Sequence, residues 1–225
     1  MKLLRRRAKA FEIQVQDLTL HITAPEDFAE ESRAAALSFW EQLQSYGVRD
    51  PDFRSSKRAL TRVASDAPPI VQEVVSAASA AGVGPMFSFR GAVVDSVGRF
   101  LAEQSGDVTV ACDGDYYIKA KKRMKVAVRR RGGEPLTIVL TAGKGLGLST
   151  TLGRGRGGAG PDGLAVIAQS CMLADAAAAG VQACLRKPDG FGMALHYLQR
   201  VPGVSGGVVV VGDRIGVAGG VEIAG

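Results

Sequence analysis

The residue that most needs a chemical explanation is Asp175, in the segment V-I-A-Q-S-C-M-L-A-D-A-A-A-A-G from Val166 to Gly180. A β-branched run leads there into an alanine-rich helical pattern, and Asp175 is its single carboxylate. Burying an ionised carboxylate is strongly unfavourable unless an ion pair or a metal compensates for it. Two interpretations stay open: Asp175 faces a ligand, or the helix turns it toward water.

Three further carboxylates could join such a site. Asp95 lies inside the helical stretch G-A-V-V-D-S-V-G, and Asp113 and Asp115 flank a glycine. Each also has a structural explanation, as a helix-surface charge or a turn residue. The two histidines match no metal-ligand spacing, and the sequence contains no G-x-S-x-G motif, so neither a zinc centre nor a hydrolytic triad is predicted.

The segment 142–163 is so rich in glycine that we expect a long loop. Its G-K-G-L-G-L-S-T part lacks the order of a P-loop, in which Lys immediately precedes Ser or Thr. Its backbone N–H groups, hydroxyls and cations could still cradle an anion: Ser149, Thr150, Thr151, Lys144, Arg154 and Arg156. A merely flexible loop explains the same composition.

The net charge of +6 favours anionic partners. Much of the excess lies at Arg5 to Lys9 and in the stretch 119–131, K-A-K-K-R-M-K-V-A-V-R-R-R. That stretch lacks the interleaved aromatic residues of nucleic-acid modules, so a solvated hairpin is the favoured interpretation and nucleic-acid binding is not expected.

A chain of 225 residues, 46% of them hydrophobic, is ordinary for a globular protein, and we expect one domain over 1–225. The cysteines Cys112, Cys171 and Cys184 form no C-x-x-C pair, which suits free thiols in a reducing cytoplasm. The start of the sequence lacks the apolar region of a secretion signal, and no stretch reaches about 18 consecutive apolar residues. We therefore expect a cytoplasmic protein that does not span a membrane.

Hydrophobic periodicity predicts the elements that must position these residues. Strict alternation predicts a hairpin over 11–22, and capping signals predict helices over about 24–47, 67–81 and 85–104, with a loop at 50–65. Apolar runs predict strands at 108–112, 116–118, 124–128, 136–140 and from 166, and a closing hairpin over 208–217. Helices and mostly antiparallel strands in this order indicate the α+β class.

Three segments, in order, resemble the bacterial ApbE-type FAD:protein FMN transferases: G-V-G-P-M-F-S-F-R-G-A-V-V-D-S-V-G, C-D-G-D-Y-Y-I and V-I-A-Q-S-C-M-L-A-D-A. The closer likeness, over nearly the whole chain, is to an uncharacterised family related to those enzymes. That likeness is marked by A-G-V-G-P-M, L-A-D-A-A-A and the final G-V-V-V-V-G-D-R-I-G-V-A-G. The resemblance implies an ApbE-like fold, with a mixed, mostly antiparallel sheet packed against helices.

The resemblance also implies a ligand and a reaction. In the transferases a Mg²⁺ ion, held partly by the Asp that matches Asp175 and by a Thr one helical turn later, helps to cleave FAD and to pass FMN to a protein threonine. For this chain it implies a flavin nucleotide, FAD or FMN, as a small anionic ligand, and Mg²⁺ at Asp175. The residues implied to contact the nucleotide are Arg90, Asp95, Asp115, Ser149, Thr150 and Thr151.

The chain departs from the transferase pattern at several points. Ala179 stands where the Thr ligand is expected, no H-x-x-D-P-like segment precedes Val166, and Phe87 and Phe89 stand where small residues are usual. Two hypotheses follow. The chain is an enzyme with Mg²⁺-dependent FMN transferase or FAD pyrophosphatase activity, or it is a non-catalytic binding or interaction protein on the same fold that has lost the metal site.

Overall fold

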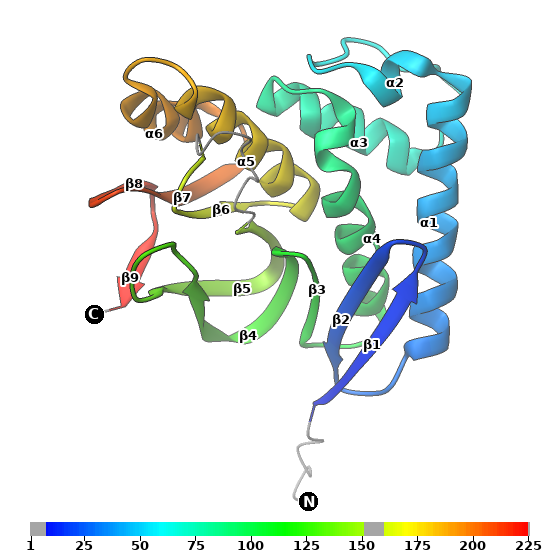
Figure 1. Cartoon of the computed structure of the whole chain (residues 1–225). Coiled ribbons are helices and arrows are strands. Elements are labelled where there is room, and N and C mark those ends of the chain that lie inside the picture. The colour runs from blue at the N-terminus through cyan, green and yellow to red at the C-terminus, as the bar shows by residue number, and fades with distance from the viewer. Residues whose placement is uncertain (1–7, 151–159, 225) are drawn as a thin grey trace, which may run out of the picture.

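A computed structural model describes residues 8–150 and 160–224, which form a sheet and a set of helices (Figure 1). The strands are β1 (Lys9–Val15), β2 (Leu18–Ala24), β3 (Val108–Cys112), β4 (Asp115–Val128), β5 (Leu136–Ser149), β6 (Gly163–Ala168), β7 (Val204–Val211), β8 (Arg214–Gly219) and β9 (Glu222–Ala224). The helices are α1 (Ala29–Arg49), α2 (Pro51–Ser55), α3 (Pro69–Ala81), the 3-10 turn η1 (Pro85–Ser88), α4 (Phe89–Gln104), α5 (Cys171–Leu185) and α6 (Gly190–Arg200). The predicted α+β class is confirmed.

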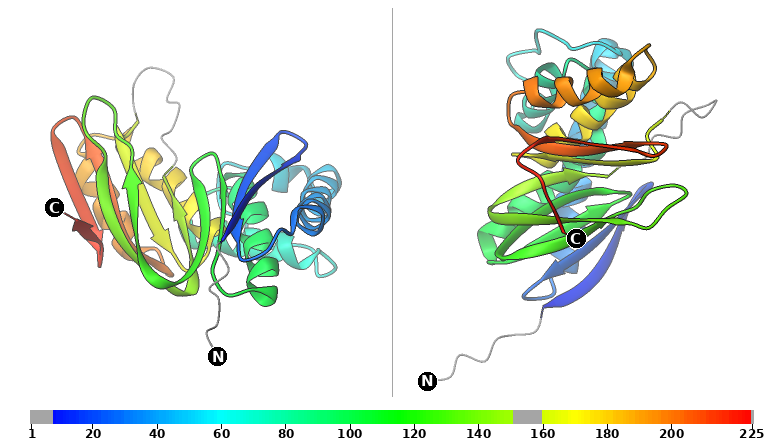
Figure 2. Two further views of the ribbon diagram at one scale, coloured as in Figure 1. Left: turned by 90° about the horizontal axis from the view of Figure 1, so that it is seen from below. Right: turned by 90° about the vertical axis from the view of Figure 1, so that its left-hand side faces the viewer.

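The strands follow one another through the sheet in the order β1-β2-β3-β4-β5-β6-β7-β8, and β9 pairs with β5. Neighbouring strands are antiparallel. In the predicted first hairpin, Ile13 and Val15 are buried while Glu12 and Gln14 are exposed, as strict alternation requires. Figure 2 (right) shows helices α5 and α6 stacked on one side of the strands.

The predicted glycine loop is wrong over its first part, because 142–149 belong to β5. The strand forms since its backbone pairs with β4, as in Leu146↔Ile118 and Leu148↔Tyr116, and since both leucines are buried. Gly147 is required there by close approach: a Cβ on it would lie 2.2 Å from the backbone of Ser170 and Cys171. The extended pieces predicted at 116–118 and 124–128 likewise belong to one bent strand, β4.

Two helix boundaries also differ from the predictions. Helix α1 begins at Ala29 rather than near residue 24, because β2 continues to Ala24 and pairs there with Lys9. Part of the loop predicted at 50–65 is the short helix α2, whose N-terminus is capped by the Asp50 carboxylate.

Helices α4 and α5 pack closely, and this contact positions the residues of interest. Helix α5 begins at the predicted strand-to-helix junction, where the Ser170 hydroxyl accepts a hydrogen bond from the Leu173 amide. A Cβ on Gly91 of α4 would lie 2.7 Å from the Cys171 carbonyl oxygen and 2.8 Å from the Asp175 Cβ. The glycine therefore lets the backbone of α4 reach the carboxylate on α5.

In the described part of the chain, no single helix is both long and apolar enough to cross a membrane. The helices over Pro69–Ala81 and Pro85–Gln104 meet the criterion only as a pair bent by 102°, on length and composition alone. The three cysteines are free, as predicted, and Cys112 and Cys171 are buried.

Candidate functional site

A cleft of about 1120 Å³ lies where the β1–β2 turn, β4, η1, α4 and α5 meet. These elements come from distant parts of the sequence, and Figure 1 shows α4 between the first hairpin and α5. The cleft is lined by Asp17, Leu18, Met86, Phe87, Phe89, Arg90, Asp113, Gly114, Tyr116, Ala127, Arg129, Thr150, Asp175 and Gln182.

Arg90 lines this cleft and is held from behind by a buried carboxylate. Its Nε donates to Asp115 Oδ2 at 2.7 Å, and Asp115 has 0% of its side chain exposed. The Ser149 hydroxyl donates to the other oxygen, Asp115 Oδ1, at 2.6 Å. Burial opposes the charge of Arg90, but the ion pair with Asp115 raises the pKa of Arg90 above its usual value. The guanidinium therefore stays charged at the wall of the cleft, with its orientation fixed.

Asp175 is half-buried and lines the same cleft, so it does not simply face bulk water. Its Oδ2 accepts a hydrogen bond from the Gly91 amide at 3.0 Å. Burial raises the pKa of Asp175 well above its usual range, and the charge of Asp115 raises it further, while Arg90 and the Gly91 amide oppose the shift. The carboxylate is thus costly to ionise without a further positive charge in the cleft.

Phe87 and Phe89 line the cleft without filling it. Phe87 is 37% exposed, and Phe89 is half-buried at the start of α4. The Lys57 ammonium lies 5.4 Å from the centroid of the Phe87 ring. Aromatic surface is therefore available beside Arg90 and Asp175.

The predicted site residues do not all gather here. Arg90, Thr150 and Asp175 line the cleft, and Asp115 and Ser149 lie directly behind Arg90. The Thr150 hydroxyl donates to the Gly114 carbonyl at 3.1 Å.

Asp95 lies elsewhere, in a second cleft, where its Oδ1 accepts a hydrogen bond from the Cys171 amide at 2.6 Å. Its Oδ2 forms an ion pair with Arg99 Nε at 3.0 Å. Lys144 also lines that second cleft. Thr151, Arg154 and Arg156, like Arg5 to Arg7, lie outside the described residues.

Several lining residues were not singled out by the sequence patterns. Asp17 was assigned only to a hairpin turn, and Arg129 only to a solvated basic face. Arg129 shares the period-2 alternation of the exposed Lys125 and Ala127, which places all three on one face of β4 and its continuation, but nothing in the sequence indicates what that face meets. Asp17 and Leu18 join the cleft because the first hairpin folds next to the elements that form its other walls.

Part of the basic stretch 119–131 is engaged within the protein. The Lys119 ammonium donates to the Ala102 carbonyl at 2.9 Å, and Arg123 forms an ion pair with Glu222. Lys121 and Lys122 are exposed. These contacts agree with a largely structural role for the stretch.

Comparison with known proteins assigns the chain to a family. The family model described as AbpE bacteria matches residues 1–190. The chain belongs to the AbpE bacteria family. The relatives of this chain include a UPF0280 protein of Methanocella arvoryzae, which is 26% identical over 94% of this chain and 89% of that protein. A UPF0280 protein of Methanopyrus kandleri is 27% identical over 92% of this chain and 88% of that protein.

Several solved structures share the fold of this chain. The apo form of the Pseudomonas stutzeri flavinyl transferase ApbE matches with a TM-score of 0.62 and 13% identity, over 100% of this chain and 96% of that one. The flavin transferase ApbE of Vibrio cholerae matches with a TM-score of 0.62 and 11% identity, over 94% and 98%. The predicted ApbE-like fold is therefore confirmed. The family match and the UPF0280 relatives confirm the predicted membership of an uncharacterised family.

The side chains that could act as metal ligands determine what kind of metal site the cleft offers. Asp175 supplies one hard oxygen ligand at the cleft, and Ala179, one turn later, supplies none. Among the described residues, no group of three or more His, Cys, Asp or Glu side chains is placed to hold a metal ion. Mg²⁺ is commonly held by one or two carboxylates, waters and a substrate's phosphates. The residues therefore fit a Mg²⁺ that shares its ligands with a bound phosphate, and do not fit a metal held by the protein alone.

Proposed function

We propose that the cleft binds a flavin nucleotide, FMN or FAD. The observation that carries the proposal is the combination, in one open cleft, of two phenylalanine rings with a guanidinium fixed by a buried carboxylate. A planar isoalloxazine ring gains contact area and stacking energy against Phe87 or Phe89. A phosphate is the group that a fixed guanidinium recognises best. The volume of about 1120 Å³ is sufficient for a nucleotide.

The charges that line the cleft support a role for Asp175 in this binding. Among the described residues, three carboxylates line the cleft, those of Asp17, Asp113 and Asp175, against the guanidinium groups of Arg90 and Arg129. Since Asp115 already balances Arg90, these described residues present a phosphate with an excess of negative charge. We propose that Asp175 holds a Mg²⁺ ion that arrives with the nucleotide. When bound, this ion neutralises phosphate charge.

Binding is the proposal, rather than the transfer reaction implied by the resemblance. Ala179 offers no metal ligand, and neither His21 nor His196 lines the cleft. FMN transferase or FAD pyrophosphatase activity is a second candidate, favoured by the position of Asp175 at the cleft wall. Incubation with FAD and Mg²⁺ separates the two, because either activity releases AMP, and simple binding releases none.

Flavin fluorescence tests the proposed binding. The fluorescence of FMN should be quenched saturably as the protein is added, and the affinity for FMN should be higher with Mg²⁺ than with EDTA. Asp175→Asn should remove this difference in affinity. Phe87→Ala should weaken FMN binding about tenfold, on the order of one lost aromatic contact. Met193→Ala, which truncates an exposed apolar side chain on α6 outside the cleft, is the matched control. Absence of saturable quenching by both FMN and FAD would refute the proposal.

A further inference from the structure

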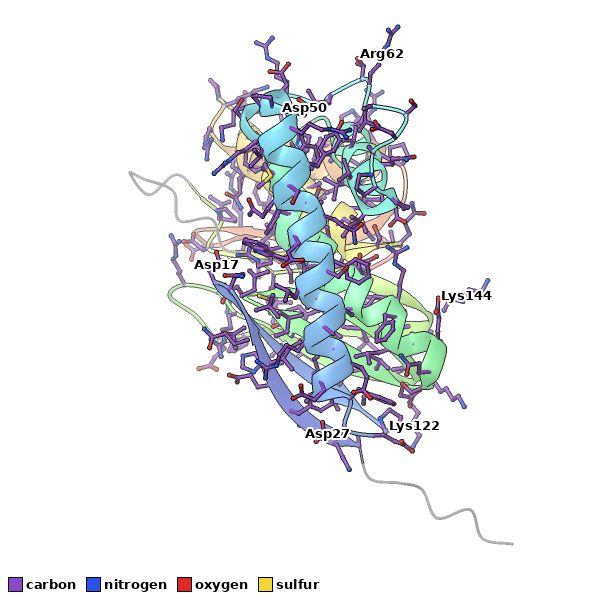
Figure 3. The ribbon with its side chains drawn as sticks, turned by 90° about the vertical axis from the view of Figure 1, so that its right-hand side faces the viewer. Asp17, Asp27, Asp50, Arg62, Lys122 and Lys144 are labelled. Carbon is purple, nitrogen blue, oxygen red and sulfur yellow. The ribbon has the colours of Figure 1, made fainter. Side chains whose placement is uncertain are left out.

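A second cleft, of about 450 Å³, opens on another face of α4. Among the residues that the structure describes, it shares no lining residue with the first cleft. Figure 3 labels Asp17, which lines the first cleft, and Lys144, which lines the second, on opposite sides of the ribbon. The second cleft is lined by Glu73, Ser76, Ala77, Ala80, Asp95, Arg99, Tyr117, Lys144, Gly145, Gln169, Ser170, Met172, Leu173 and Pro202. The resemblance implied a nucleotide contact for one of these residues, Asp95, but the proposed flavin site does not include this cleft.

The central charged group of this cleft is Arg99. Its Nε forms an ion pair at 3.0 Å with Asp95, whose carboxylate is 2% exposed and also accepts a hydrogen bond from the first amide of α5. Arg99 Nη2 donates to Glu73, a side chain of α3 that is 42% exposed. Asp95 thus fixes one edge of the guanidinium from inside the protein, and Glu73 occupies another edge from the solvent side.

The two contacts of Arg99 differ in how easily they can be exchanged. The Asp95 contact is buried and tied to α5, so it belongs to the fold. The Glu73 contact is between two half-exposed side chains, and such ion pairs contribute little stability. A carboxylate from solution can therefore replace that of Glu73 on Arg99 at little cost to the fold.

The remaining walls suit the body of a small ligand. Ala77, Ala80, Met172, Leu173 and Pro202 supply apolar surface, and Lys144 adds a second cation. Lys144 lies in an irregular part of β5. The next residue, Gly145, has a φ of +90°, which favours glycine, and a Cβ added to it would lie 2.8 Å from the Tyr117 hydroxyl oxygen. With Glu73 displaced, Arg99 and Lys144 exceed Asp95 by one positive charge, so a single carboxylate balances the cleft.

We infer that this second cleft binds a small organic acid, one carboxylate on an apolar body, through Arg99 and Lys144, and that Glu73 is the internal competitor that this acid displaces. The inference does not depend on flavin binding, since the two clefts share no described lining residue.

Phenylacetate is a suitable probe, with phenylacetamide as its neutral isostere. In ¹⁵N–¹H spectra of the full chain, phenylacetate should shift the amides of Ser76 and Gln169 saturably and leave Phe87 and Gln182 unshifted. Glu73→Gln should tighten phenylacetate binding at least threefold, because the competing carboxylate is gone. Lys144→Met should weaken it at least threefold, and Arg99→Met should abolish it.

FMN binding at the first cleft should be the same in Glu73→Gln as in wild type, which keeps the two proposals separately testable. The inference is overturned if the Ser76 and Gln169 amides show no saturable shift in either wild type or Glu73→Gln. It is equally overturned if phenylacetamide binds as well as phenylacetate, or if Glu73→Gln leaves the phenylacetate affinity unchanged.

Discussion

At the scale of single residues, the contact that gives the candidate site its character is the one between Arg90 and Asp115. The sequence and its resemblance singled out both residues, and also Ser149, but not their roles. Ser149 was expected to touch phosphate, whereas it is buried and its hydroxyl donates to Asp115. A local pattern can indicate that a hydroxyl belongs to a site, but only the pairing of β4 with β5, Asp115↔Ser149, determines what that hydroxyl faces.

Asp115→Asn should destabilise the fold, since it leaves a half-buried guanidinium without its partner. We expect a loss of about 2–4 kcal/mol in the free energy of unfolding, measured by urea denaturation at pH 7. Asp113→Asn is the control, because Asp113 lies 3.8 Å from the same guanidinium but is 76% exposed, and it should cost no more than about 0.5 kcal/mol. Equal losses in the two variants would contradict the assignment of Asp115 as the main partner of Arg90.

Asp95 should make stability depend on pH. Burial raises the pKa of Asp95 to about 6 from 3.8, against the opposing effects of the Cys171 amide and Arg99. The folded protein therefore favours the neutral acid, so this contribution is fully present below pH 3.8 and is lost as the pH rises through about 6. Wild type should lose this contribution as the pH rises, and Asp95→Asn should not. The free energy of unfolding of Asp95→Asn minus that of wild type should therefore rise by up to about 3 kcal/mol between pH 4 and pH 7. Parallel pH profiles of the two proteins would refute this prediction.

At the scale of elements, the glycine-rich segment 142–149 is a case in which amino-acid composition predicted the wrong structure. Glycine lowers the intrinsic preference for a strand, so the composition of 142–149 indicates a loop. The structure makes it a strand because pairing and burial of Leu146 and Leu148 outweigh that preference, and because α5 packs directly on Gly147. By contrast, the hairpin at the start of the chain and the helices α3, α4 and α5 could be predicted, since their periodicity and capping residues are local.

Gly147→Ala tests this explanation of β5. A Cβ at Gly147 would lie 2.2 Å from the backbone of Ser170 and Cys171, so either β5 or the start of α5 must move. We expect the free energy of unfolding to fall by about 1–3 kcal/mol, measured by denaturant titration.

The matched control is Gly143→Ala, in the same strand, where an added Cβ meets nothing within 4 Å. It should change the free energy of unfolding by no more than about 0.5 kcal/mol. If Gly147→Ala is as stable as Gly143→Ala, close approach is not the reason for the glycine.

At the scale of the whole molecule, the resemblance predicted the fold, and the structure shows how that fold produces two clefts. The first cleft joins Asp17, Arg90, Arg129 and Asp175, which are carried by separate parts of the chain. The second cleft contains Asp95, whereas Asp175 lines the first, because Arg90 and Asp95 lie on different faces of α4 and so line different clefts. No local spacing predicts such a division, since it depends on which elements pack against each face of the helix.

The central claim is that the first cleft recognises a flavin nucleotide with its fixed guanidinium, and calorimetric titration of FMN in the presence of Mg²⁺ tests it most directly. Wild type and Arg90→Met should be compared under one set of conditions, each first shown to be folded by circular dichroism. We predict saturable binding of one FMN per chain by wild type, and at least tenfold weaker binding by Arg90→Met, because the phosphate loses a charge-assisted hydrogen bond. No saturable heat with wild type, or equal FMN affinities of the two proteins, would contradict the claim.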